Sequence, residues 1–199
     1  MSPELHINLA NLKSNIKFFQ RIIKKNTELS AVVKSDAYGL GIAKIVPEIE
    51  RYGVRSFFTA TISEAIKIRS YSRDCEIFTL NGFDFLKSNL YREHNITPII
   101  NNILEAQKFI EIFNQTQKVA IQLNTGMNRL GLDKQSLLEN IDIIKSLPLN
   151  LILSHLACAD DTSNKENTEQ KDLFIKLCQI LPNIRQSLSA SHGTLLGND

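Results

Sequence analysis

The stretch LSAVVKSDAYGLG, residues 29–41, joins a short apolar run to a lysine and then to two glycines one position apart. An uninterrupted run with β-branched residues is typical of a buried strand, and the glycine pair is typical of a tight loop. A lysine at the end of such a strand has two interpretations. It is a side chain that reaches solvent, as most lysines do, or it is a group placed there for chemistry.

Working outward from this stretch, strand-like runs alternate with segments of helical spacing. The further strand candidates are residues 56–61, 76–82, 96–100, 119–124, 149–155 and, more weakly, 184–189. Apolar residues three or four positions apart predict helices around positions 12–23, 103–113, 137–144 and 173–180. This alternation predicts an α/β protein with a parallel sheet, since several strands are apolar on both faces.

Two architectures fit that pattern: an open, doubly wound sheet and a (β/α)₈ barrel of the TIM type. No GxGxxG sequence follows the first strand, and the chain contains no Walker-type loop. Both absences argue against dinucleotide and triphosphate binding.

The bulk composition predicts a globular domain in the cytoplasm. The chain has 199 residues, of which 43% are hydrophobic and 22% are charged, and its net charge of +2 gives no basis for nucleic-acid binding. No apolar run is long enough to span a membrane, and the first residues lack the apolar core of a signal peptide. The three cysteines have no regular spacing, so we expect free thiols.

Polar residues stand where the strand candidates end. Lys34 closes the first run, Asn124 and Thr125 close the fifth with Arg129 close behind, and His155 closes the sixth. The carboxyl ends of parallel strands meet on one face, so the pattern favours a shared site. Each residue taken alone also has an ordinary structural interpretation, as a solvated cation or a hydrogen-bonded histidine. His155 and Cys158 have metal-ligand spacing without a second pair, so we expect no metal site.

Three segments taken together resemble the alanine racemases. They are AVVKSDAYGLG (residues 31–41), LNTGMNRLGL (123–132) and LSHLACADD (153–161), and weaker similarity extends over essentially the whole chain. The resemblance implies a fold-type III enzyme that depends on pyridoxal 5′-phosphate. It also implies an α/β barrel joined to a C-terminal β-rich domain in a head-to-tail homodimer.

The resemblance also assigns roles to five residues. It implies that Lys34 binds the cofactor aldehyde through its primary amine, and that Tyr38 contacts the cofactor phosphate. Arg129 matches the arginine that holds the catalytic tyrosine and the substrate carboxylate. His155 matches the histidine beside the pyridine ring, and Ser191 matches a serine that contacts the phosphate.

The implied reaction is the interconversion of L-alanine and D-alanine for peptidoglycan synthesis, with Lys34 as one acid–base group and a tyrosine of the partner subunit as the other. Two alternatives remain. One is a non-catalytic pyridoxal-phosphate-binding barrel of the homeostasis type, and the other is a different fold-type III enzyme such as an amino-acid decarboxylase.

The chain departs from the family pattern in several places. Gln122 stands where many relatives carry a lysine that can be carbamylated. The sequence also stops before the segment that supplies the eighth strand, so we expect residues 1–199 to form an incomplete barrel of about seven strands without the second domain. A truncated gene product, a frameshift and an independent short protein all fit this ending, and activity of the chain by itself is open.

Overall fold

The computed structural model describes residues 4–197, and the chain divides into two compact units at the boundary between Phe78 and Thr79. All strand pairing recorded between the named strands is parallel. All seven predicted strands are present, each somewhat shorter than the sequence run that predicts it.

The first unit begins with helix α1 (Leu9–Ile22), followed by strand β1 (Ser30–Val32). Next come α2 (Lys34–Tyr38), α3 (Ile42–Arg51), β2 (Ser56–Thr59), α4 (Ile62–Tyr71) and β3 (Glu76–Thr79), whose last residue begins the second unit. Strand β1 pairs in parallel with β2, with Ala31 opposite Phe57. The rings of Phe58 and Phe78 stack at 4.8 Å between β2 and β3, so the core of this unit lies along its strands.

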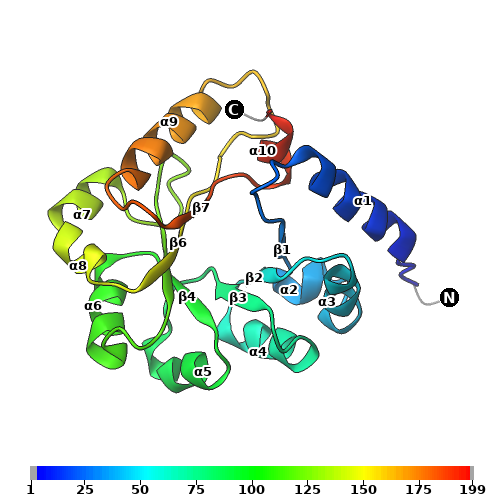
Figure 1. Cartoon of the computed structure of the whole chain (residues 1–199), viewed down its shortest axis with the longest axis horizontal. Coiled ribbons are helices and arrows are strands. Elements are labelled where there is room, and N and C mark those ends of the chain that lie inside the picture. Colours follow the sequence, from blue (N-terminus) through cyan, green and yellow to red (C-terminus); the bar gives the residue numbers. More distant parts are fainter. Residues whose placement is uncertain (1–3, 198–199) are drawn as a thin grey trace. The chain divides into compact units, whose positions relative to one another are not determined.

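The second unit repeats the same alternation. Its elements are the short 3₁₀ helix η1 (Phe85–Lys87), α5 (Ser88–Glu93), β4 (Thr97–Ile100), α6 (Ile103–Phe113), β5 (Val119–Gln122), α7 (Lys134–Glu139), α8 (Ile141–Lys145), β6 (Leu149–Leu153), α9 (Glu166–Cys178), β7 (Arg185–Ser187) and α10 (Ser191–Leu195). Helices α6, α8 and α9 lie on one side of strands β4 to β7 (Figure 1). Every residue of β4 and β5 is buried, as expected for strands that are covered on both faces.

An aromatic cluster fills the core beside α6. Phe83 makes ring contacts with Tyr91, Phe109 and Phe113, at centroid distances of 5.4, 5.4 and 5.6 Å. Aromatic side chains bury more apolar area than other residues, so this cluster anchors α6 to the segment that follows β3.

Strand order decides between the two architectures that the sequence left open. Within each unit the strands lie side by side in chain order, and each is parallel to the next where the pairing is recorded. A doubly wound sheet reverses its strand order at a switch point, and neither unit contains such a reversal. The order is that of a (β/α)₈ barrel.

The helix expected around positions 137–144 is broken in two. Asn140 lies between α7 and α8 with φ −120° and ψ 27°, and its side-chain amide donates a hydrogen bond of 3.0 Å to the Ser136 carbonyl oxygen. Asparagine side chains compete with the backbone for such hydrogen bonds, which explains the interruption.

Candidate active site

Lys34 is presented at the carboxyl end of β1. Val33, directly before it, is buried and donates a backbone hydrogen bond of 2.8 Å to the Phe58 carbonyl oxygen on β2. Lys34 itself is half-buried, and its ammonium nitrogen lies 6.0 Å from the centre of the Tyr38 ring. The structure thus brings together two of the predicted site residues, Lys34 and Tyr38, the latter with 62% of its surface exposed.

The segment that joins these two residues is a left-handed turn. Ser35, Asp36, Ala37 and Tyr38 all have φ between 53° and 56°, and Gly39 continues the turn with φ 83°. Each L-residue in this conformation costs roughly 1–2 kcal/mol because its Cβ approaches the following carbonyl oxygen. Consecutive positive φ angles in four non-glycine residues therefore require support from the surrounding structure.

Hydrogen bonds on both sides of the turn supply that support. The backbone amide of Ser35 donates to Glu64 Oε1 at 2.7 Å, and the amide of Ile42 donates to Asp36 Oδ1 at 3.0 Å. Within the turn, the amides of Ala37 and Gly39 donate to the carbonyl oxygens of Val33 and Ser35. The turn is consequently tied to both α3 and α4.

In the second unit, a loop of residues 124–132 carries Arg129 and folds back over the end of β5. Leu123 and Leu132 form an isolated parallel bridge, which closes the loop at its base. Asn124 Oδ1 accepts the backbone amides of Gly126 at 3.2 Å and Asn128 at 3.0 Å, which shapes the loop from inside. Arg129 lies exposed on this closed loop.

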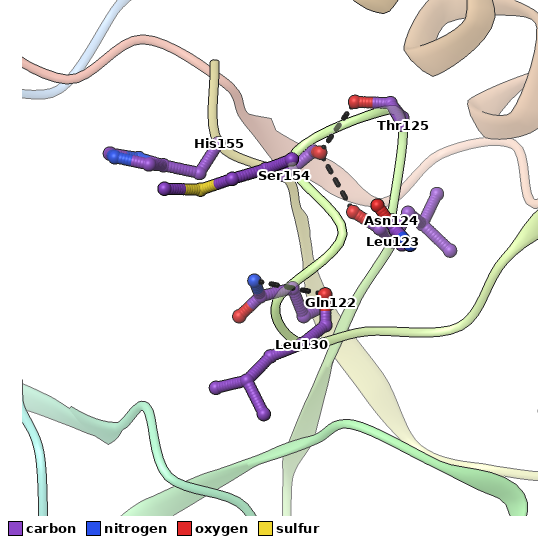
Figure 2. Close-up of a pocket in the computed structure, with 8 residues that line it drawn as sticks. Gln122, Leu123, Asn124, Thr125, Leu130, Ser154 and His155 are labelled. Atoms are coloured by element: carbon purple, nitrogen blue, oxygen red, sulfur yellow. Dashed lines mark hydrogen bonds between the residues drawn. The ribbon is translucent and has the colours of Figure 1, made fainter. Parts of the chain in front are cut away.

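A small crevice lies between this loop and the end of β6 (Figure 2). It is lined by Gln122, Leu123, Asn124, Thr125, Met127, Leu130, Ser154 and His155. Ser154 Oγ donates to the Leu123 carbonyl oxygen at 2.7 Å and lies 2.8 Å from Thr125 Oγ1, so the hydroxyl pair joins the ends of the two strands. The predicted strand-end residues of β5 and β6 therefore do lie together.

Gln170 on α9 adds a second connection between the same two segments. Its side-chain oxygen accepts the backbone amide of Ala157 at 2.9 Å, and its side-chain nitrogen donates to the His155 carbonyl oxygen at 3.1 Å. The same nitrogen lies 3.5 Å from Thr125 Oγ1. Gln170 is buried, so these contacts fix the end of β6 from the helix side.

The remaining predicted residues occupy the ends of the second unit's elements. His155 is half-buried and follows β6 by two positions, whereas Ser191 is the exposed first residue of α10. Gln122 is buried, and its side-chain nitrogen lies 3.5 Å from the Leu130 carbonyl oxygen on the Arg129 loop. Three of the five predicted residues, namely Arg129, His155 and Ser191, thus belong to the second unit.

Cys158, which the sequence pairs with His155 as a possible metal ligand, has a different partner. Its thiol lies 3.4 Å from Glu166 Oε2, and this hydrogen bond to a carboxylate, together with desolvation, raises the pKa of the Cys158 thiol. Among residues 4–197 no group of three or more potential metal-ligating side chains is assembled.

A larger hollow of about 300 Å³ lies at the opposite ends of β6 and β7. It is lined by Lys145, Leu147, Leu149, Ile180, Leu181, Pro182 and Ile184. Six of these seven side chains are apolar, and none belongs to the predicted site.

Sequence reasoning missed three side chains that hold the segments after the strands in place: Glu64, Glu105 and Gln170. Each accepts at least one backbone amide in the segment that follows a strand. A signal was present for two of them, because Thr61 to Glu64 and Asn102 to Glu105 share the pattern of an N-cap residue followed three positions later by Glu.

Within the described part of the chain, no helix is both long and apolar enough to cross a membrane.

The fold and the site together define a barrel-type α/β domain, in which polar side chains gather where parallel strands end. A model of the family "Alanine racemase, N-terminal domain" matches residues 7–199. The chain belongs to this family.

Curated relatives agree with the family match. The chain is 35% identical over 202 residues to an alanine racemase of Rickettsia akari and 36% identical to one of Rickettsia canadensis, in each case over 98% of the chain and 57% of the relative. The chain thus spans a little over half the length of the curated relatives it matches.

Solved structures share the fold. A crystal structure of alanine racemase from Bartonella henselae with covalently bound pyridoxal phosphate is 32% identical and superimposes with a TM-score of 0.89, over 96% of this chain and 57% of that one. The alanine racemase from Acinetobacter baumannii, at 24% identity, has a TM-score of 0.85 over 97% of this chain and 59% of that one. The expected barrel architecture is confirmed.

Proposed function

We propose that this chain supplies the cofactor-binding part of an alanine racemase, in which Lys34 holds pyridoxal 5′-phosphate. The observation that carries the proposal is the placement of Lys34. Lys34 follows the exposed strand β1 and the buried Val33, the residue is half-buried, and the backbone amide of the next residue, Ser35, is held by the carboxylate of Glu64. Family membership and the cofactor named for the Bartonella henselae relative support it further.

The side chains present fit this cofactor chemically. Only a primary amine condenses with its aldehyde, and Lys34 is one. Hydroxyl groups such as those of Tyr38 and Ser191 suit a phosphate, and the imidazole of His155 suits an aromatic ring. When bound, pyridoxal phosphate withdraws electrons from the amino-acid Cα and so acidifies its proton.

The roles of this chain's own residues follow. The ε-amine of Lys34 would take or return the proton at the Cα of alanine on one face. We assign the exposed guanidinium of Arg129 to the substrate carboxylate, since it offers parallel donors to a planar anion. The second acid–base group, a tyrosine of the partner subunit in a homodimer, is part of the same proposal, as are a cytoplasmic location and a role in supplying D-alanine for peptidoglycan.

Covalent labelling tests cofactor binding. The purified chain is incubated with pyridoxal 5′-phosphate, reduced with borohydride and mapped by peptide mass spectrometry, with Lys34→Met as the control. We expect the label on Lys34 in preference to the exposed lysines. Equal labelling of lysines over the whole surface would overturn the proposal.

A second measurement separates the racemase from the non-catalytic carrier. In deuterated water with the cofactor present, proton NMR follows the exchange of the Cα proton of L-alanine. One acid–base group suffices for exchange, whereas loss of the other slows racemisation by about 10²–10⁴-fold. Exchange that disappears in Lys34→Met supports the racemase, and labelling of Lys34 without any exchange supports the carrier.

A further inference from the structure

The carboxylate of Glu64 connects the end of β1 to the end of β2 within the first unit. Its Oε1 accepts the backbone amide of Ser35 at 2.7 Å. Its Oε2 accepts the amides of Ala60 at 2.8 Å and Thr61 at 3.2 Å. Both oxygens are therefore occupied by backbone donors, and one of those donors belongs to the residue directly after Lys34.

The same arrangement occurs at the next pair of strands. Glu105, in the first turn of α6, accepts the amides of Asn101 at 2.9 Å and Phe83 at 3.2 Å through Oε2. Asn101 follows β4, and Phe83 lies in the segment after β3. Gln170 on α9 does the equivalent for the ends of β5 and β6.

A side chain near the start of the helix after each even-numbered strand thus holds the end of its own strand and the segment after the preceding strand. We name this set the strand-end clamps, and its members are Glu64, Glu105 and Gln170. Their recurrence shows that clamping belongs to the scaffold. What differs is the segment that each one holds.

Only the Glu64 clamp acts on a residue adjacent to Lys34. Ser35 begins the left-handed turn, with φ 53°, and the direction of the Lys34 side chain depends on the backbone at this junction. The Glu105 clamp holds Phe83 instead, and none of the five predicted site residues lies in that segment.

We infer that Glu64 is a positioning residue for Lys34: by holding the Ser35 amide it keeps the left-handed turn, and with it the amine, in the orientation that captures an aldehyde cofactor. The inference rests on the proposed function for the identity of that cofactor. Glu64 acts only through the backbone, since its carboxylate oxygens are taken up by amide donors.

Glu64→Gln tests this inference, with Glu105→Gln as the matched control. Glutamine retains one acceptor oxygen, so it cannot serve donors on both sides as the carboxylate does. We expect hydrogen exchange of the Ser35 amide, followed by NMR, to be about tenfold faster or more in E64Q, since a hydrogen bond to a charged group is lost. In E105Q this amide is expected to exchange at the wild-type rate.

The second measurement is the rate at which Lys34 captures pyridoxal 5′-phosphate, trapped with borohydride at several pH values. We expect E64Q to be slower at Lys34 by about tenfold, with labelling of the other lysines unchanged. Urea unfolding of both variants checks that E64Q loses no more stability than E105Q.

Each outcome decides a separate question. Wild-type capture and amide exchange in E64Q, or equal slowing of capture in both variants, would overturn the inference. A wild-type chain that captures no cofactor at Lys34 would overturn the proposed function. The Ser35 exchange rate requires no cofactor, so an unchanged rate in E64Q would still refute the clamp itself.

Discussion

Gly131 closes the Arg129 loop at a place where no side chain fits. Its φ is 103°, and an added Cβ would lie 2.8 Å from the backbone oxygen of Gln122 and 3.0 Å from the backbone nitrogen of Asn124. Both obstructing atoms belong to the main chain, which cannot rotate away. The turn that returns the loop to its base therefore requires glycine for two reasons, the backbone angle and the space.

We predict that Gly131→Ala lowers the free energy of unfolding by about 2–4 kcal/mol, measured by urea denaturation. Gly53→Ala is the matched control, because Gly53 has φ 86° with no atom within 4 Å of an added Cβ. The control should cost only the conformational part, about 1–2 kcal/mol. Equal losses in the two variants would show that the close approach at Gly131 relaxes.

The sequence identifies a candidate site residue only where a side chain with suitable chemistry stands at a position marked by the pattern, such as the end of a strand. Lys34 and His155 stand out because a polar residue ends an apolar run. Glu64 and Gln170 do not stand out, because Glu and Gln are ordinary residues near helix starts. Their significance depends on contacts with Ser35 and Ala157, which are 29 and 13 positions distant in sequence.

At the scale of one element, glycine usually destabilises a helix, but in the left-handed turn α2 it would relieve backbone strain. Ala37 is buried at 3% exposure and has φ 56°, a conformation that glycine adopts without strain. Ala65, fully buried in the right-handed helix α4, has no such strain to relieve.

We therefore predict that Ala37→Gly lowers the free energy of unfolding by about 1–2 kcal/mol less than Ala65→Gly does, since each variant loses one buried methyl group but only the former relieves a left-handed alanine. Thermal or urea unfolding of the two variants gives the comparison. A larger loss for Ala37→Gly would contradict the left-handed assignment.

The contribution of Glu105, at the start of α6, to the stability of the fold depends on pH. Burial raises the pKa of the Glu105 carboxyl above its ordinary 4.5, against the opposing effect of the amides of Asn101 and Phe83. Because the pKa of the folded state lies above that of the unfolded state, this group's contribution to stability is fully present below about pH 4.5 and is lost as the pH rises through the folded value.

Glu105→Gln removes this titration. The variant loses hydrogen bonds at every pH, but we predict that its stability deficit relative to the wild type shrinks between about pH 4 and pH 7. Urea unfolding at four pH values measures the deficit. A deficit that grows with pH would mean that the amide donors, and not burial, dominate at this carboxylate.

Element prediction succeeded where the sequence carries an apolar run or a helical period, and failed where it carries neither. Strands β2 to β6 follow from short runs rich in apolar residues, the polar strand β7 is indicated only weakly, and α6 follows from apolar residues at helical spacing. The left-handed turn has no comparable pattern, because Lys-Ser-Asp-Ala-Tyr contains no glycine before position 39. It exists because hydrogen bonds from α3 and α4 compensate for its local cost.

At the scale of the whole molecule, the reactivity of the cysteine thiols can be used to follow the unfolding of each unit. The three thiols are free, as the sequence predicted; Cys75 lies in the first unit, whereas Cys158 and Cys178 lie in the second. Burial raises the pKa of Cys178 to about 11, and it also raises the pKa of Cys75.

We predict one thiol that reacts slowly with a disulfide reagent at pH 8, namely Cys158, and two that stay protected until their units unfold. Mass spectrometry of labelled peptides over a urea gradient then follows the first unit through Cys75 and the second through Cys178. Rapid labelling of Cys178 in the native chain would contradict this prediction, because it would show that local motions expose this thiol without global unfolding of the second unit.

The fold class could be predicted from the alternation of segments, and the choice of a barrel required the resemblance or the strand order. Composition alone leaves the doubly wound sheet open, since both folds use parallel strands buried on two faces. The division at Phe78 and Thr79 could not be predicted either, because it falls inside a strand, where no linker composition marks it.

The handedness of the turn after β1 has a consequence for how this segment can change. In a left-handed turn, successive residues advance around the axis in the sense opposite to that of an α-helix. The amine of Lys34 here lies over the ring of Tyr38, four residues later. A substitution leaves the four-residue spacing intact. An insertion or deletion would rotate the side chains of Lys34 and Tyr38 relative to each other by roughly 100° about the axis of the turn. This segment should therefore tolerate substitutions far better than insertions or deletions.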